Sequence, residues 1–192
     1  IFNFLMEGKK DKILFWLESY YIHFGIAKSI TEKYTCESYA LISCTPNQKM
    51  FYDNQKLIDF QNTWYVRDFI DLEKKSPDFE KLKWFEEKLK IPLTKIAYAD
   101  RLFYKFNDFY KFNDNEIFSL IQQELEFYDK VLDEISPDFV VMRAPEFHDI
   151  DLFCEICKAK NIKVLLLSPV RMGDRYRITS EPDAPIHFDT SD

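Results

Sequence analysis

Two uninterrupted apolar runs in the second half of the chain constrain its fold more than any other feature. They are residues 139–142 and 164–167, and a helical pattern over residues 149–160 separates them. Neither run alternates with polar residues, which is typical of strands buried on both faces of a parallel sheet. The order strand, helix, strand therefore predicts a βαβ unit in a sheet that helices cover on both sides.

The rest of the chain continues this alternation. We expect strands over residues 12–17, 38–43 and 63–66, with an extended segment at 176–179. Helices are expected over 24–33, 54–60, 93–104 and 115–135, and one more helix should begin at Ser76 as its N-cap with Pro77 in the first helical position. The predicted class is α/β: a Rossmann-like, open, mainly parallel sheet with helices on both faces. Without an interior linker, residues 1–180 are expected to form one domain and 181–192 a linker or tail.

Composition excludes several classes of function. The chain has only 3 Gly and no Gly-rich phosphate loop, and its net charge of -7 argues against a nucleic-acid partner. The carboxylates and the 4 Cys do not have metal-site spacing, so we expect no metal. Cys154 and Cys157 form a C-x-x-C pair inside a helical pattern, where buried free thiols are expected rather than a redox pair.

No apolar run approaches the length of a membrane helix, and we expect no transmembrane segment. Free thiols fit a cytoplasmic location, with no membrane contact beyond a peripheral one at the inner membrane face. The chain does not begin with Met, so we expect it to be a piece of a longer protein with a further domain.

A polar loop follows the first predicted strand and holds two candidate site residues. His23 precedes the helix expected at Phe24, where free N–H groups can bind an anion, and its imidazole could act as a general base. Gly25 has no side chain, so a ligand can approach the backbone closely. The alternative for His23 is a structural role, hydrogen-bonded to backbone beside the core.

Polar residues also follow the two late strands, whose carboxyl ends meet at the edge where open α/β sheets bind ligands. Glu146 and His148 could form an acid–base pair, or could cap the helix that follows them. The guanidinium groups of Arg143, Arg171 and Arg175 suit phosphate or carboxylate, although surface ion pairs are the alternative.

Two more features lie between the early and late strands. Arg101 stands in an apolar stretch, so its charge is either paired with Asp100 or directed at a ligand. The hexapeptide Phe-Tyr-Lys-Phe-Asn-Asp occurs twice in tandem, at residues 103–108 and 109–114. The repeat either packs its rings into the core or leaves a surface on which sugars or bases stack.

Four segments resemble the amino-terminal half of surface or capsular polysaccharide biosynthesis proteins, glycosyltransferases of the two-Rossmann-domain (GT-B) type. They are Tyr-Ile-His-Phe-Gly-Ile-Ala-Lys-Ser at residues 21–29, Ile-Ala-Tyr-Ala-Asp-Arg-Leu-Phe-Tyr at 96–104, Ile-Ser-Pro-Asp-Phe-Val-Val at 135–141 and Ala-Lys-Asn-Ile-Lys-Val-Leu-Leu-Leu at 159–167. Gly25 is the only glycine of the first loop, which departs from a Gly-rich family pattern.

The resemblance implies transfer of a sugar from a nucleotide-sugar donor to a saccharide acceptor, with no metal and no further cofactor. The amino-terminal domain then supplies the acceptor side, with His23 and His148 as base or acceptor contacts, and a missing carboxyl-terminal domain supplies most of the donor site. A different class remains open: a non-catalytic α/β module that binds a partner protein or a small anion.

Overall fold

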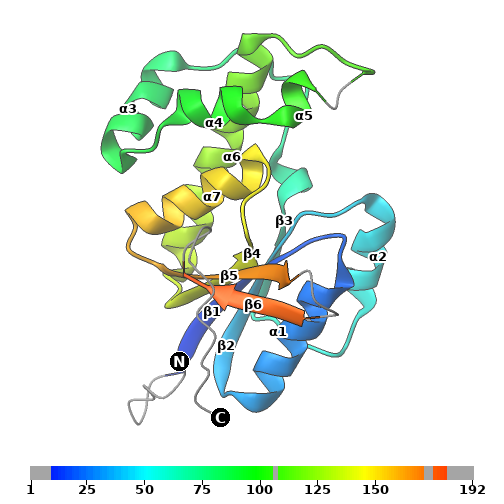
Figure 1. Cartoon of the computed structure of the whole chain (residues 1–192). Helices are drawn as coiled ribbons and strands as arrows, with labels where there is room; N and C mark the ends of the chain where they lie inside the picture. Colours follow the sequence, from blue (N-terminus) through cyan, green and yellow to red (C-terminus); the bar gives the residue numbers. More distant parts are fainter. Residues whose placement is uncertain (1–9, 106–107, 171–174, 181–192) are drawn as a thin grey trace.

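The computed structural model describes residues 10–105, 108–170 and 175–180 (Figure 1). Its centre is a six-stranded sheet in the order β3-β2-β1-β4-β5-β6. All neighbouring strands are parallel except β5 and β6, which are antiparallel. The strands are β1 (Asp11–Leu17), β2 (Cys36–Ile42), β3 (Asn62–Tyr65), β4 (Phe139–Arg143), β5 (Lys163–Val170) and β6 (Arg175–Thr179).

Helices cover both faces of this sheet, which confirms the predicted α/β, Rossmann-like class (Figure 1). One face carries α1 and α2, the other carries α6 and α7, and α3, α4 and α5 lie beyond these at the amino-terminal end of α6. No helix within the described ranges is long and apolar enough to cross a membrane. The helices are α1 (Tyr21–Lys33), α2 (Pro46–Asn54), the 3₁₀ turn η1 (Val66–Phe69), α3 (Phe79–Leu89), α4 (Leu93–Ala99), α5 (Arg101–Tyr104), α6 (Asp114–Ile135) and α7 (His148–Ala159).

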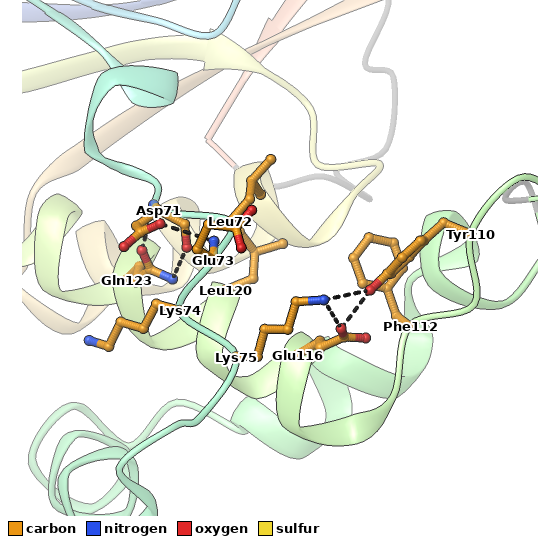
Figure 2. A pocket seen from close by; sticks show the side chains of 10 residues that line it. All are labelled: Asp71, Leu72, Glu73, Lys74, Lys75, Tyr110, Phe112, Glu116, Leu120 and Gln123. Atoms are coloured by element: carbon orange, nitrogen blue, oxygen red, sulfur yellow. Dashed lines mark hydrogen bonds and ion pairs between the residues drawn. The ribbon is translucent and has the colours of Figure 1, made fainter.

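The connection from η1 to α3 is fastened along α6 by side chains of that helix. The Gln123 amide accepts from the Asp71 N–H at 2.7 Å and donates to the Asp71 carbonyl at 3.2 Å (Figure 2). Ser119 Oγ donates to the Lys74 carbonyl at 2.5 Å, and Gln122 Oε1 accepts from the Asp78 N–H at 2.7 Å. A segment without regular structure is therefore held in one place because its backbone groups have partners.

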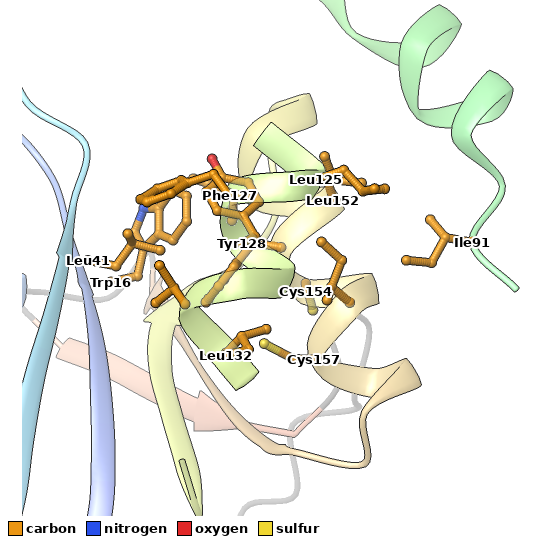
Figure 3. Packing of buried hydrophobic residues seen from close by; sticks show 14 of the residues in the cluster. Trp16, Leu41, Ile91, Leu125, Phe127, Tyr128, Leu132, Leu152, Cys154 and Cys157 are labelled. Atoms are coloured by element: carbon orange, nitrogen blue, oxygen red, sulfur yellow. The ribbon is translucent and has the colours of Figure 1, made fainter. Parts of the chain in front are cut away.

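The core is divided by the sheet, and β1 shows why its sequence does not alternate. Leu14 and Trp16 point into the layer of α6 and α7, whereas Ile13, Phe15 and Leu17 point into the layer of α1 and α2. Figure 3 shows the first layer, where the indole of Trp16 lies against the ring of Tyr128, with centroids 5.7 Å apart. Both faces of β1 are buried from Ile13 to Leu17, so apolar residues occupy each of these five positions.

Four helix predictions were wrong, and one of them, the single helix expected over 93–104, is two helices, α4 and α5, because Asp100 ends the first and is the N-cap of the second. The helix over 54–60 does not form, because Thr45 and Pro46 start α2 earlier, where Gln48 Oε1 accepts from the Thr45 N–H at 3.1 Å. The helix expected at Ser76 begins at Phe79, because the carboxylate of Asp78 accepts from the Lys81 N–H at 3.0 Å and is the N-cap. Helix α1 begins at Tyr21 rather than Phe24. The predicted tail at 181–192 lies outside the described residues.

Candidate functional site

A crevice opens at the point where the sheet order reverses. The chain leaves β1 toward β2 on one side, and it leaves β4 toward β5 on the other, so the two connecting loops diverge. The volume between them is about 240 Å³. We call it the switch-point crevice, and its polar and aromatic lining is Tyr20, His23, Arg143, Glu146 and Tyr176.

Arg143, the last residue of β4, is held in this crevice by two carboxylates. Its Nε donates to Glu18 Oε1 at 2.7 Å, and its Nη1 donates to Glu146 Oε2 at 2.7 Å. Trp16 Nε1 donates to the same Glu18 oxygen at 2.9 Å. Burial raises the pKa of Glu18 against the opposing attraction of Arg143. Glu18 therefore ties the ends of β1 and β4 together and fixes the direction of the guanidinium group.

His23 lies in the first turn of α1 rather than before it, because the helix starts at Tyr21. Its side chain is buried, its ring meets that of Tyr176 edge-on at 6.3 Å, and its Nδ1 has no hydrogen-bond partner among the residues that the structure describes. Burial, followed by the charge of Arg143, lowers the pKa of His23. The imidazole is therefore neutral at pH 7 and keeps a lone pair that can accept a proton.

His148 occupies a second hollow, of about 310 Å³, on the far side of the β4–α7 loop. Its Nδ1 lies 2.5 Å from Asp100 Oδ2, and its backbone N–H donates to the same oxygen at 2.7 Å. Its Nε2 lies 3.3 Å from Glu124 Oε2 on α6, an ion-pair distance without hydrogen-bond geometry. Glu146 lines both hollows, so it separates His148 from the switch-point crevice instead of pairing with it.

Opposing effects act on this buried histidine. Burial disfavours its charged form, but the carboxylate of Glu124 and the hydrogen bond with Asp100 outweigh burial and place the pKa of His148 well above its ordinary value. For Asp100, burial is likewise outweighed by its hydrogen bonds with His148, and its pKa is lowered. The arrangement is a buried charged group between two carboxylates, which links the α4–α5 junction, α6 and α7.

The other predicted ligand contacts lie elsewhere. Gly25 is exposed in the second turn of α1, and a Cβ added there would meet nothing within 4 Å, so the backbone makes no close approach at that point. Arg101 is exposed at the first position of α5, and Arg175 is exposed at the first position of β6, opposite Val170. Arg171 lies outside the described residues.

Sequence reasoning missed most of the residues that surround the two histidines. Tyr20 and Glu18 directly follow β1, so their place at a strand's carboxyl end was a usable signal. Tyr176 reaches the crevice only because β6 pairs antiparallel with β5, which no local pattern indicates. Asp100 and Glu124 come to His148 from positions 48 and 24 residues away in the chain.

The chemistry available in the crevice is proton transfer and hydrogen bonding. Within the described ranges, no group of three or more His, Cys, Asp or Glu side chains could hold a metal ion. The neutral imidazole of His23 can take a proton. The N–H groups of Arg143 that do not donate to Glu18 or Glu146 can donate to a ligand oxygen.

No protein-family model matches the chain, and no curated protein matches it either. Among solved structures, it is similar to UDP-GlcNAc 2-epimerase from Methanocaldococcus jannaschii, with 13% identity, a TM-score of 0.46, and coverage of 85% of this chain and 33% of that one. A UDP-N-acetylglucosamine 2-epimerase has 14% identity and a TM-score of 0.46, with coverage of 87% of this chain and 36% of that one. The Neisseria meningitidis UDP-GlcNAc 2-epimerase bound to UDP-GlcNAc has 12% identity and a TM-score of 0.44, with coverage of 84% of this chain and 33% of that one.

The chain thus spans about a third of the length of these proteins. A likeness of this size carries no argument about chemistry, so the fold class rests on the strand order itself. The resemblance to capsular polysaccharide glycosyltransferases stays a prediction.

Proposed function

We propose that the switch-point crevice holds the hydroxyl group of a saccharide acceptor, and that His23 takes its proton while a sugar is transferred from a nucleotide-activated donor. The chain would then be the acceptor-side domain of a glycosyltransferase of surface polysaccharide synthesis. The imidazole of His23 is neutral and buried, which supports a role as general base. Such a base accelerates a reaction by roughly 10²–10⁴-fold.

The observation that carries this proposal is the compensated charge of Arg143. Its guanidinium already donates to Glu18 and Glu146, so the crevice holds more carboxylate than cation. A diphosphate ligand requires uncompensated positive charge, whereas a sugar hydroxyl requires only a donor and an acceptor. The crevice therefore suits the neutral acceptor, and we assign the donor nucleotide to a further domain.

In the proposed step, the acceptor oxygen forms a bond to the anomeric carbon of the donor sugar. The bond from that carbon to the diphosphate oxygen breaks, and the nucleoside diphosphate leaves with the electron pair. The proton of the acceptor hydroxyl passes to the imidazole of His23. Arg143 donates to the acceptor oxygen and orients it, and Glu18 acts as a positioning residue for Arg143.

The test uses the complete encoded protein, a panel of nucleotide sugars and neutral saccharide acceptors, with release of nucleoside diphosphate as the readout. We expect His23→Asn to lower kcat by about 10²–10⁴-fold and to leave the KM for the donor near that of the wild type. Ser29→Ala, on an exposed position of the same helix, is the matched control and should retain full activity. A His23→Asn protein with wild-type kcat would overturn the assignment.

One observation favours the non-catalytic alternative. Among the described residues that line it, the crevice combines one histidine with one cation, because His148 lies in the second hollow. On that alternative, inorganic phosphate binds at Arg143, no sugar is transferred, and His23→Asn and His148→Asn leave binding intact. Titration with phosphate, followed by the ¹⁵N shifts of the His23 ring, separates the two functions.

A further inference from the structure

A third hollow lies away from both the switch-point crevice and the hollow at His148. It is a trough of about 320 Å³ between residues 71–75 and the first turns of α6, with Tyr110 and Phe112 at one end (Figure 2). The volume falls within the range of small-molecule sites, about 300–1,000 Å³. Most of the surface that lines it is apolar, and Leu72 and Leu120 lie between its two ends.

The walls of this trough are fixed without a ligand. The side-chain amide of Gln123 accepts from the N–H of Asp71 and donates to its carbonyl, and the hydroxyl of Ser119 donates to the carbonyl of Lys74. Figure 2 shows the contacts between Gln123 and Asp71 at the end of the trough opposite the aromatic rings. Little conformational entropy is then lost when a ligand enters, which favours binding by a small molecule.

The tandem repeat supplies the aromatic end. In the first copy Phe103 is buried, with its ring 4.6 Å from that of His148. In the second copy Phe112 is half-buried against the core, and its ring meets that of Tyr110 at 4.9 Å, while Tyr110 stays 44% exposed at the trough. The first position of the repeat is therefore buried in one copy (Phe103) and fully exposed in the other (Phe109), whereas the tyrosine is about half exposed in both, Tyr104 at 49% and Tyr110 at 44%.

The charges at the aromatic end compensate one another. Lys75 Nζ lies 2.9 Å from Glu116 Oε1 and donates to the Tyr110 hydroxyl at 3.1 Å, and that hydroxyl donates to Glu116 at 2.5 Å. The hydroxyl and the ammonium group together hold the pKa of Glu116 at about 2, so the carboxylate stays ionised. Among the described residues that line this end, the cation is Lys75, and it is already paired with Glu116, so an anionic ligand would gain little there.

We propose that this trough binds a neutral saccharide, one pyranose ring of which packs its C–H face on the ring of Tyr110, with Phe112, whose ring meets that of Tyr110 edge-on, beside it. Its hydroxyl groups reach the remaining lone pairs of Glu116 and the remaining N–H of Lys75. A purely apolar ligand would fill the volume but would cover these polar groups without bonding to them, which is unfavourable. The residues of the trough are separate from those of the crevice, so this site does not depend on the proposed transferase activity.

The experiment titrates the ¹⁵N-labelled chain with methyl β-glucoside, with diacetylchitobiose, and with phenol and glucuronate as comparison probes. We expect both neutral saccharides to shift the amide signals of residues 71–75 and of Glu116 and Gln123, with no shift at His23. Tyr110→Ala should weaken this binding about tenfold, since an aromatic contact contributes about that much. Tyr110→Phe keeps the ring and should stay within about threefold of wild type.

Phe109→Ala is the matched control, because Phe109 is 100% exposed in the same repeat and does not line the trough. It should bind the saccharides as wild type does. The proposal is overturned if neither saccharide shifts these signals, if phenol or glucuronate binds in their place, or if Phe109→Ala loses as much affinity as Tyr110→Ala. If Tyr110→Ala fails to fold, the amide signals that the saccharides shift in the wild-type chain still test the proposed binding site.

Discussion

His148 is a residue whose charge state is set by three carboxylates from three places in the chain. Asp100 lies at the α4–α5 junction, Glu124 on α6 and Asp149 beside His148 in the first turn of α7. The ring of Phe103 covers it at 4.6 Å between centroids. Removing one partner of a buried ion pair costs about 3–5 kcal/mol, so we expect the loss of any one of these side chains to destabilise the fold.

The raised pKa of His148 has a consequence for stability that can be measured. A group whose pKa is higher in the folded state stabilises the fold fully below its unfolded pKa of 6.5, and that stabilisation is lost as pH rises through the folded value. We therefore expect the free energy of unfolding to fall as pH rises above about 6.5 because of this residue. Urea unfolding at a series of pH values between about 6 and 9 measures the slope.

His148→Gln supplies the comparison, because it removes the titrating ring and leaves the other groups that titrate in this range. Its free energy of unfolding should be lower than that of the wild type and should depend less on pH. Equal slopes for the two proteins would contradict a raised pKa at His148.

The backbone conformation at the end of a helix also affects the free energy of unfolding. Helix α3 ends at Leu89, and its C-cap, Lys90, has a φ of 56° and a ψ of 37°, in the left-handed region. A residue with a Cβ pays about 1–2 kcal/mol there, and glycine does not. We expect Lys90→Gly to raise the free energy of unfolding by about 0.5–1 kcal/mol, after glycine's larger loss of backbone entropy is counted. Urea unfolding of the variant against the wild type measures this difference.

Lys83→Gly is the matched control, since it places the same substitution on an exposed position inside the same helix. There it should lower the free energy of unfolding by about 1 kcal/mol. If both variants shift stability in the same direction, the end of α3 is not in the left-handed conformation.

The length and burial of each helix explain whether the sequence could predict it. Helix α6 was placed within one residue, because its buried stripe recurs at helical spacing from Ile117 to Ile135 in a helix of 22 residues. Helix α2 was missed, because only Tyr52 among its nine residues is buried and no stripe exists. Short, exposed helices depend on capping contacts, and Thr45 with Pro46 is equally typical of a turn.

At the scale of the whole molecule, the sequence predicted the strands but only part of the site. Buried parallel strands can be recognised in the sequence as apolar runs. The polar residues that follow them, such as His23 and Arg143, come together because the carboxyl ends of the strands lie at one edge of the sheet. The separation of His148 from the crevice could not be predicted, since it depends on where Asp100 and Glu124 lie in three dimensions. Long-range packing decides which side of a loop a side chain takes.

Cysteine reactivity reports on the packing of the whole molecule. Cys154 and Cys157 are fully buried on α7, which packs against α4, α6 and β5, whereas Cys36 and Cys44 are half-buried. Burial raises the pKa of Cys154 to about 11 and that of Cys157 well above its ordinary value, so neither is a reactive thiolate. With a disulfide reagent at about pH 8, we expect two thiols to react early and two only as the molecule unfolds.

The assignment of the two phases is checked with paired variants. Cys36→Ser with Cys44→Ser should remove the early phase, and Cys154→Ala with Cys157→Ala should remove the late one. Because the inner face of α7 is covered by elements from both halves of the chain, exposing it requires that these elements separate. The late phase should therefore slow when the fold is stabilised, as in Lys90→Gly, while the early phase stays unchanged. Four thiols reacting in one early phase would mean that α7 opens independently of the sheet.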